Sequence, residues 1–575
     1  MSFTWHGSAC RDDVVNVGPL ALIHPLLQKL DLAGIIDRHL PADPQLECPY
    51  GSVLSLLVAA RLSQPTALVN VADWADKTGA DILWNIPVDK LNDDRLGRAL
   101  DVFFEQRHSI LASATVQALR LVDMSLERLH FDTTHVTFYG SYASSRPRPT
   151  IALEDLRGDA ELPPAHITNG YLTKHHMLQV GMTSVVDERG AVPIFSQCLD
   201  GNRNGHTAIR EQVQLLDQHL RLPEGTLMIS DRGTFSAEHL ARLLRHGRHA
   251  LCSVPWNDYR ALYDAHVERL QWQTASYLSI EQQRRRNTNS SLPREEYRIA
   301  VLKHQLTDPI THQPFDCRVL FVHSSADAKE CQKRREHNIA KIKAGLDAIA
   351  LKVQRAHPRS DAASVARQIV RLFGKRQAAR YFRWELVPLS AEEHAAATPI
   401  GRGFRRPTHR LVYHFDADAA QADARYDGCS ALVTTAPLTQ SGDLLFTQFK
   451  EQNFVELDHH QWKSPIAVSP VFLKSPRRVE ALLALLQLAL QANQILERSY
   501  RQALPDDAPI REQRMTAETL LRQFAVYGLL IERTPLGRVV YATRLTTRQR
   551  AILTRLGYPT PAQTLARTLP RAATG

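Results

Sequence analysis

The sequence predicts an α/β protein built on a mixed five-stranded sheet that helices cover. The first observation is a series of three strand-like runs between residues 129 and 199, of which the last two are joined by the turn-like Asp187-Glu188-Arg189-Gly190. The second is that helix-like and strand-like segments alternate over 207–254. Adjacent strands followed by alternating helices and strands are typical of a mixed sheet with helices packed on it. We expect strands at 129–138, 176–186, 191–199, 226–231 and 249–254, and helices at 207–219 and 236–246.

Residues 1–125 predict a helical domain that precedes the sheet. Apolar residues recur at spacings of three and four over 20–30, 52–62 and 95–121, as they do on one face of a helix. Prolines separate these segments, and Asn92-Asp93-Asp94 has the composition of a helix start. Since 575 residues are too many for one hydrophobic core, the chain is expected to hold two to four domains.

The sheet domain is expected to be interrupted by an insertion. Its second part begins with a strand at 431–435, followed by a helix over about 444–463 and a nearly all-apolar, buried helix over 478–496. Between the two parts of the sheet domain, strand-like runs flank charged helices, which predicts an α+β insertion. The expected divisions are a helical N-terminal domain at 1–125, the sheet domain at 126–256 and 426–500, the insertion at 257–425 and a small C-terminal region at 501–575.

The charged helices of the insertion have two interpretations. Residues 326–380 carry 14 Lys and Arg against 5 Asp and Glu. Such a basic face can contact a nucleic-acid backbone. It can equally belong to a solvated helical hairpin, and the sequence does not choose between the two.

Composition narrows the classes of protein and partner. The net charge of +10 and pI of about 9.3 favour an anionic partner, nucleic acid first. The seven cysteines form no CxxC pair, so neither a zinc ribbon nor a disulfide framework is expected. We expect reduced thiols, as in a cytoplasmic protein. No signal peptide is visible, and the apolar stretch near 480–490, broken by Gln487, is too short to span a bilayer.

Three carboxylates in different structural settings are the strongest functional feature. Asp132 lies within the first expected strand, Asp231 ends the fourth, and Glu456 lies on the helix over 444–463. Open α/β sheets place their sites at the carboxyl ends of strands. Carboxylates together with phosphate oxygens are the usual ligands of Mg²⁺. Two such ions roughly 3.5–4 Å apart can clamp the attacking and leaving oxygens of a phosphoryl displacement.

The helix around Glu456 carries a set of polar and aromatic residues at helical spacing. Phe449 and Gln452 precede Glu456 by seven and four residues, and Lys463 follows it by seven. At 3.6 residues per turn these side chains share one face, whereas Asp458 lies on another. The alternative is an amphipathic helix with incidental charges. We favour a functional face because the two aspartates occupy matching places on the expected sheet.

This pattern resembles the DDE transposases of bacterial insertion sequences. It is most similar to the branch with a Tyr-x2-Arg-x3-Glu-x6-Lys signature, whose spacing the chain keeps. Two residues depart from that signature, Phe449 for Tyr and Gln452 for Arg. The uncharged Gln452 cannot replace the attraction of an arginine for phosphate. The other similar blocks are 94–100, 131–134, 170–175, 201–202 and 229–233.

The resemblance implies an RNase H-like (retroviral integrase) fold for the catalytic domain and an enzyme that cleaves and transfers DNA strands. Asp132, Asp231 and Glu456 would hold two Mg²⁺ ions, for which Mn²⁺ substitutes. A water activated by the ions attacks the phosphodiester at the element's end, and the freed 3′-OH attacks target DNA. The implied partners are terminal inverted-repeat DNA, target DNA and a second copy of the chain in a synaptic homodimer. The implied location is the bacterial cytoplasm, with the protein on the nucleoid when bound to DNA.

The same resemblance implies residues that touch DNA. Lys463 is expected to contact the DNA backbone. Gln452, Phe449 and Lys174 are the other residues of these blocks that are expected to touch DNA. A hairpin intermediate would need an aromatic platform for an unstacked base, a contact worth roughly 1–3 kcal/mol. Trp462 or Trp256 could provide it, although packing in the core is the alternative for both. A zinc site is not expected, because no HxxxH pair lies on a helix face. The histidines considered for it are His175-His176, His206 and His459-His460. Of these, His175 could approach the carboxylates.

Two other functions remain open at this point. An RNase H-like nuclease would keep the fold and the carboxylates without joining strands. A DNA-binding protein derived from an inactive element would keep only end binding.

Overall fold

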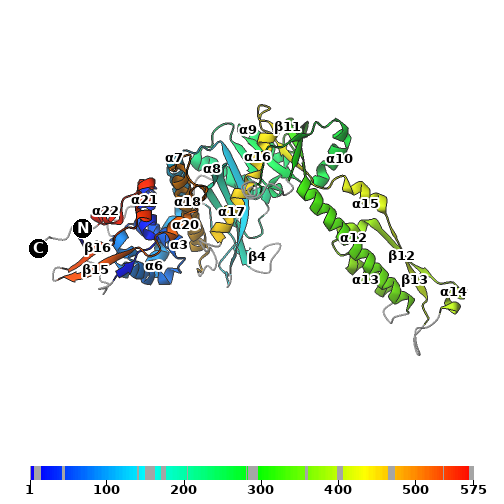
Figure 1. The fold of residues 1–575 in the computed structure, drawn as a ribbon, viewed down its shortest axis with the longest axis horizontal. Helices are drawn as coiled ribbons and strands as arrows, with labels where there is room; N and C mark the ends of the chain where they lie inside the picture. Colours follow the sequence, from blue (N-terminus) through cyan, green and yellow to red (C-terminus); the bar gives the residue numbers. More distant parts are fainter. Residues whose placement is uncertain are drawn as a thin grey trace.

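The computed structural model describes residues 2–5, 14–41, 46–138, 141–148, 162–169, 176–203, 205–279, 282, 295–355, 361–397, 406–463, 473–534 and 537–568. Figure 1 shows an elongated molecule with the N-terminal helices and both termini at one end. The large sheet lies in the middle, and a narrow arm that contains α12 and α13 projects from the other end.

The central sheet is mixed, as predicted, but twice as wide as expected. It contains ten strands in the order β4-β5-β3-β7-β8-β14-β11-β10-β9, with β6 paired to β5. β3, β5 and β6 pair antiparallel, whereas β3, β7 and β8 run parallel. The strands are β3 Arg128–Phe138, β4 Thr168–Asn169, β5 His176–Asp187, β6 Gly190–Asp200, β7 Leu227–Ser230, β8 His249–Val254, β9 Gln273–Thr274, β10 Tyr297–Thr307, β11 Pro314–Ser324 and β14 Cys429–Thr434.

The first part of the expected insertion, with β9, β10 and β11, therefore belongs to the sheet itself. β14 pairs antiparallel with β8, and β11 and β10 continue outward from β14. An uncovered β8 would leave a row of backbone donors and acceptors without partners, and β14 supplies them. The boundaries expected at 257 and 425 thus do not mark a separate domain for these strands.

Helices from distant parts of the chain cover the sheet. α8 packs beside Phe131 and Leu199 on one face, and α17 lies over β3, β5 and β6 on the other. Caps fix where the helices begin: the Ser236 hydroxyl accepts the His239 N–H at the start of α9, and Ser475 caps α18 in the same way. The helices are α8 Gly205–Leu220, α9 Ala237–Arg245, α16 Gly442–Lys450, α17 Gln452–Lys463 and α18 Pro476–Gln502.

The N-terminal helices share one core with the sheet domain. α18 contacts α3, α6 and α7 on one side and β6 on the other. By length and composition, α18 could cross a membrane, contrary to the expectation from Gln487, but 94% of its most apolar window is buried inside the protein. The helices are α1 Leu20–Lys29, α2 Leu32–His39, α3 Tyr50–Ser63, α4 Val71–Thr78, α5 Ala80–Trp84, α6 Asp93–Glu105 and α7 Arg107–Val122.

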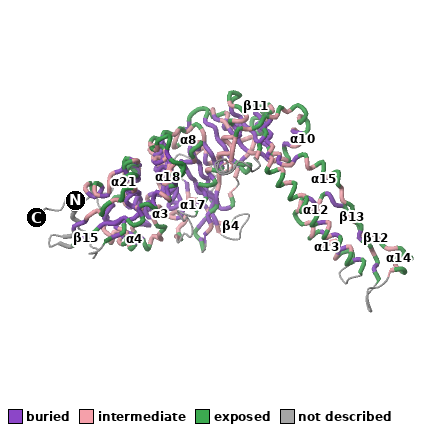
Figure 2. Tube along the Cα trace, in the orientation of Figure 1, coloured by how far each residue is buried: buried purple, intermediate pink, exposed green. Residues whose placement is uncertain are grey.

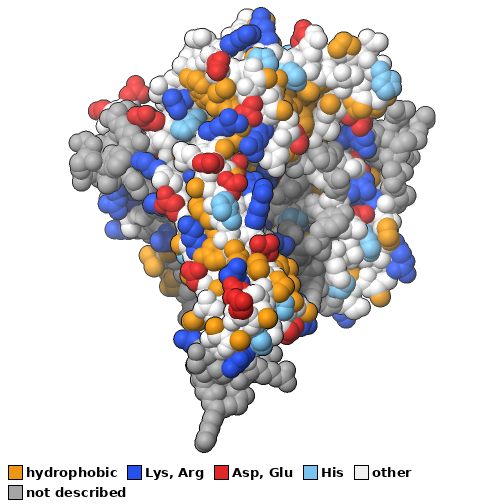
Figure 3. Space-filling view, turned by 90° about the vertical axis from the view of Figure 1, so that its right-hand side faces the viewer, with side chains coloured by type: hydrophobic (Ala, Val, Ile, Leu, Met, Phe, Trp, Pro, Cys, Tyr) orange, Lys and Arg blue, Asp and Glu red, His pale blue; other side chains and the backbone are white. Residues whose placement is uncertain are grey.

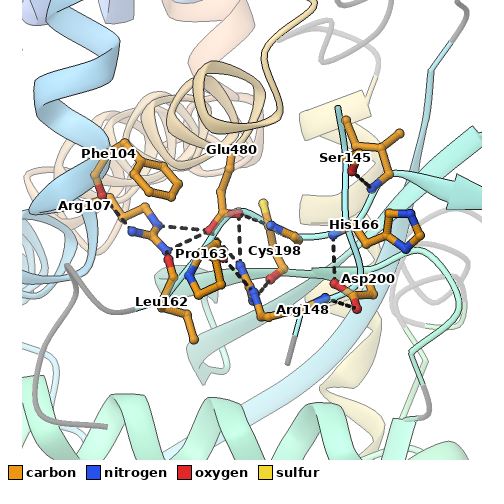
Figure 4. A network of polar contacts seen from close by, with 12 residues as sticks. Phe104, Arg107, Ser145, Arg148, Leu162, Pro163, His166, Cys198, Asp200 and Glu480 are labelled. Carbon is orange, nitrogen blue, oxygen red and sulfur yellow. Dashed lines mark hydrogen bonds and ion pairs between the residues drawn. The ribbon is translucent and has the colours of Figure 1, made fainter. Parts of the chain in front are cut away.

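A buried network of ion pairs and hydrogen bonds connects the N-terminal helices to the sheet domain (Figure 4). Glu480 of α18 accepts from Arg107 Nε at 3.0 Å, from Arg148 Nη2 at 3.1 Å and from the Ala165 N–H at 2.9 Å. Burial alone would raise the pKa of Glu480, but the two guanidinium groups and the N–H hold it below its usual value. The three side chains are almost inaccessible to solvent, so they fix α7, α18 and the segment after β3 to one another.

The chain ends meet in a second sheet that the sequence did not predict. Its order is β1-β16-β15-β2, so the first residues pair with the C-terminal hairpin. The divisions expected at 125 and 501 therefore do not separate these regions. The strands are β1 Ser2–Trp5, β2 Val14–Asn16, β15 Gly528–Thr534 and β16 Gly537–Ala542.

The arm is the remaining part of the expected insertion. It has its own small core, in which Ile342, Leu346, Val365 and Ile369 are buried, while most of its other residues are exposed or half-buried (Figure 2). Residues 325–428 carry 20 Lys and Arg against 12 Asp and Glu, that is +8 of the chain's +10. The elements are α12 Ser325–Gln354, α13 Ala362–Phe373, β12 Phe382–Pro388, α14 Ala391–Ala396, β13 His409–Phe415 and α15 Ala417–Ala424.

Candidate active site

Asp132 and Asp231 occupy neighbouring positions on two parallel strands. The register pairs Phe131 of β3 with Ser230 of β7, so the next residue on each strand is an aspartate. Adjacent strands lie about 4.8 Å apart, and paired residues point to the same face of a sheet. The backbone of Asp231 remains extended, with φ −80° and ψ 179°. The backbone positions of the two aspartates, far apart in sequence, are therefore neighbours at the carboxyl end of β7.

The two aspartates differ in surroundings. Asp132 is half-buried, and its Oδ2 lies 3.4 Å from His459 Nδ1 on α17. Asp231 is exposed, and its Oδ1 accepts the Gly233 N–H at 2.9 Å. This bond caps the short helix η4, Arg232–Thr234. Asp132 thus lies within β3, whereas Asp231 directly follows the last residue of β7.

Gln452 attaches α17 to the strand that carries Asp132. Its Oε1 lies 2.7 Å from His130 Nδ1, and its Nε2 donates to the Phe131 carbonyl at 3.2 Å. Burial lowers the pKa of His130 to about 3, so that this ring is neutral at pH 7. We expected Gln452 to touch DNA, and this is wrong for the conformation described: its side chain is buried and both ends of the amide are occupied. An uncharged amide satisfied on both sides can be buried at little cost.

Glu456 lies on the same face of α17, between two residues that contact β3. Gln452 is one turn before it, and His459, the partner of Asp132, is nearly one turn after it. The Glu456 side chain itself is exposed to solvent. The side-chain contacts that hold α17 on β3 are those of Gln452 and His459.

Lys463 continues this face of α17 at its last turn. Burial lowers the pKa of the Lys463 ammonium, and the nearby Asp132 carboxylate opposes that shift. Burial lowers the pKa of His135 on β3; the charge of Lys463 lowers it further, and the Asp132 carboxylate opposes the shift. The Lys463 ammonium thus lies within electrostatic reach of the Asp132 carboxylate.

The carboxylates do not form a ready-made metal cage. Among the residues that the structure describes, no group of three or more His, Cys, Asp or Glu side chains is arranged to hold a metal ion. Asp132 is turned to His459, and Asp231 to the N–H of its own turn. The chemistry of the candidate donors still suits Mg²⁺, since they are carboxylate oxygens.

The expected aromatic residues lie elsewhere. The helix expected over 444–463 is divided at Glu451, so Phe449 belongs to α16 and packs, half-buried, against a separate apolar cluster. Trp462 is fully buried and cannot receive a base in this conformation; packing, the alternative we had left open, is what the structure shows. Trp256 is half-buried, with its ring edge-on to Tyr263 at 5.2 Å. Lys174 and His175 lie outside the described residues, as does the side chain of His206.

His459 is a site residue that the sequence analysis missed. It had been considered only as a zinc ligand, whereas the structure places it against Asp132. The signal was present, because residues 452, 456, 459 and 463 fall on one helical stripe.

The fold and the candidate site together define an α/β protein with a mixed sheet, in which Asp132 and Asp231 occupy neighbouring positions on two of the inner strands. A model of a domain of unknown function, DUF4277, matches residues 13–116, which include the N-terminal helices. No curated protein matches the chain. Among solved structures, a piggyBac transposase synaptic complex with hairpin DNA is 9% identical, with a TM-score of 0.33 over 98% of this chain and 89% of that one. A likeness of that TM-score carries no argument about this chain.

Proposed function

We propose that this chain is the transposase of a bacterial insertion sequence, with an RNase H-like catalytic domain. One observation supports this most: Asp132 and Asp231 directly follow paired residues of two parallel strands, and Gln452 attaches the helix that carries Glu456 to the strand of Asp132. Segments far apart in sequence are thereby brought together by long-range pairing. The basic arm and the net charge of +10 suit a DNA substrate.

In this proposal Asp132, Asp231 and Glu456 would hold two Mg²⁺ ions, with Mn²⁺ as a substitute. When bound, such ions lower the pKa of a water and stabilise the charge that develops on a phosphodiester. Lys463 would hold a phosphate oxygen near Asp132, and His459 would orient the Asp132 carboxylate until DNA arrives. The substrates would be terminal inverted repeats and target DNA, paired by a homodimer.

The test is strand cleavage and joining on DNA that flanks the gene. Wild-type protein is expected to nick this DNA in Mg²⁺ and to join the ends to a second duplex. Asp132→Asn and Asp231→Asn should bind the DNA but not cut it. Asp506→Asn is the matched control, since Asp506 is exposed on the loop after α18. Equal cleavage by wild type and Asp132→Asn would refute the proposal.

The same assay separates the two other functions. Cleavage without joined products would indicate an RNase H-like nuclease. DNA binding without any cleavage in Mg²⁺ or Mn²⁺ would indicate a derivative of an inactive element. Short inverted repeats bracketed by a direct duplication around the gene would support the transposase.

A further inference from the structure

A cavity of about 380 Å³ lies where the arm joins the sheet. We call it the arm-root cavity. It is bounded by the turn after β7, the start of α10 (Trp256–His266), the first third of α12 and the short helix η6 (Gln377–Tyr381). Figure 3 views the molecule from the arm end and shows Lys and Arg side chains interspersed with acidic ones over this side. The lining residues used below are Arg232, Arg260, Arg334, Arg335, Arg380, Asp423 and Asp427.

The walls of the cavity carry an excess of positive charge. Five arginines face two aspartates, so the lining has a formal charge of +3. Asp427 holds Arg335 through two bonds of 2.6 Å, and Asp423 pairs with Arg380 and, at 3.4 Å, with Arg260. Three of the arginines are therefore fixed in place by these carboxylates.

Two arginines differ from the other three. Arg232 and Arg334 have no carboxylate partner among the described residues, and both side chains are exposed. The nearest polar contact of the Arg334 guanidinium is the Cys331 sulfur, at 3.4 Å. Arg232 comes from the catalytic edge of the sheet, directly after Asp231, whereas Arg334 comes from the arm. Their charge is not neutralised within this cavity.

The setting of these two cations is rigid. The Arg260 guanidinium lies 4.0 Å from the centre of the Tyr426 ring, and the Tyr426 hydroxyl donates to Asp264 at 2.8 Å. Tyr381 donates to Asp423 at 2.8 Å. A preformed concave wall with unneutralised guanidinium groups suits a phosphate, which arginine binds through paired hydrogen bonds.

We propose that the arm-root cavity binds backbone phosphates of the DNA strand that passes the candidate active site. Because Arg232 follows Asp231, a strand at the carboxylates is within reach of Arg232, and Arg334 would then join the arm to the same strand. The inference rests on the proposed function for the identity of the ligand as DNA. It adds a contact that ties the position of the arm to the cleavage site.

The experiment measures DNA affinity against salt in EDTA, where no cleavage occurs, by fluorescence anisotropy with a labelled duplex. Each phosphate contact contributes about 0.9 to the slope of log K against log salt. Arg232→Gln/Arg334→Gln should therefore lower the slope by about two, and the affinity at low salt by at least about tenfold. Arg334→Gln alone, remote from the carboxylates in sequence, should lower the slope by about one.

Arg371→Gln is the matched control, since Arg371 is exposed on α13 of the arm and does not line the cavity. Thermal unfolding checks that all variants are folded. A double variant whose slope equals that of Arg371→Gln would overturn the proposal, because the arginines would then act only as general charge.

A titration with inorganic pyrophosphate distinguishes a DNA strand from a small phosphate ligand. We expect pyrophosphate to compete with DNA for the wild-type protein, and we expect the double variant to lose pyrophosphate binding along with the two units of salt slope. Pyrophosphate binding that DNA does not displace, with an unchanged salt slope in the double variant, would overturn the proposal. If the slopes behave as expected but Mg²⁺-dependent cleavage is absent, the proposed chemistry fails and the phosphate site stands.

Discussion

Two groups of charged side chains in this protein are built in opposite ways. Around Glu480, one carboxylate and two arginines are buried, and three donors from distant segments satisfy the carboxylate. At the candidate active site, Asp231 and Glu456 are exposed, and only Asp132 is half-buried against a histidine. Buried charges must be paired, because an uncompensated one costs several kcal/mol. Exposed carboxylates on one edge contribute little to stability and remain accessible to a cation and a phosphate.

This comparison predicts that substitutions in the two groups change different quantities, the rate of cleavage in one and the free energy of unfolding in the other. Glu456→Gln and Asp231→Asn should slow Mg²⁺-dependent cleavage by roughly 10⁴-fold, about 5.5 kcal/mol, because a metal ligand is lost. The free energy of unfolding should change by less than about 0.5 kcal/mol, as is usual for exposed sites. Single-turnover cleavage and urea unfolding measure the two quantities. A large loss of stability with normal cleavage would reverse the assignment.

The buried group should show the opposite behaviour. Glu480→Ala leaves Arg107 and Arg148 buried without their shared carboxylate and should destabilise the fold by about 3–5 kcal/mol. Glu480→Gln keeps the shape of the side chain but removes its charge, and it can be measured instead if the alanine variant does not fold. The control is Glu518→Ala, which removes an exposed ion pair with Arg522 and should cost less than about 1 kcal/mol. Equal urea midpoints for the two alanine variants would contradict this account.

Gln452 is expected to stabilise the fold, as the buried group around Glu480 does, although its helix carries Glu456. Gln452→Ala leaves His130 and the Phe131 carbonyl without their partner and should cost about 1–3 kcal/mol. It should also lower cleavage, because α17 is then held less firmly over Asp132. His460→Ala, at an exposed position of the same helix, is the control and should be within about 0.5 kcal/mol of wild type.

The pH dependence of stability sharpens the same distinction. Burial lowers the pKa of His130 to about 3 in the folded state, below its ordinary value. The unfolded chain therefore binds this proton first, and stability falls as pH drops below about 6.5, by up to about 1.4 kcal/mol per unit. His130→Asn should remove this contribution, seen in urea unfolding at pH 7 and pH 5. Parallel pH profiles for variant and wild type would show that His130 is not the titrating group.

Local patterns in the sequence predicted much of the central sheet and part of the site. The strands around Asp132 and Asp231 and the helix start at Asn92 follow from alternation, turn residues and caps that act over a few neighbours. The neighbouring strand positions of Asp132 and Asp231 agree with the register of β3 and β7, whereas a shared metal site of these aspartates with Glu456 stays a prediction.

What the sequence did not predict depends on pairing over long distances. The addition of β14, β11 and β10 to β8, and of β1 and β2 to the C-terminal hairpin, is set by which edges meet, and periodicity does not show this. The burial of Gln452 depends on His130, more than three hundred residues away. The break at Glu451 had no proline or glycine to announce it.

The most direct test of the central claim is affinity cleavage by iron in place of Mg²⁺. With hydrogen peroxide as oxidant and ascorbate as reductant, Fe²⁺ bound in the presence of DNA generates hydroxyl radicals that cut the polypeptide near the metal. Cuts near residues 132, 231 and 456, all suppressed by Mg²⁺ and absent from Asp132→Asn, are the result expected if the three carboxylates share the ions. Cuts confined to one of these segments, or unaffected by Mg²⁺, would contradict it.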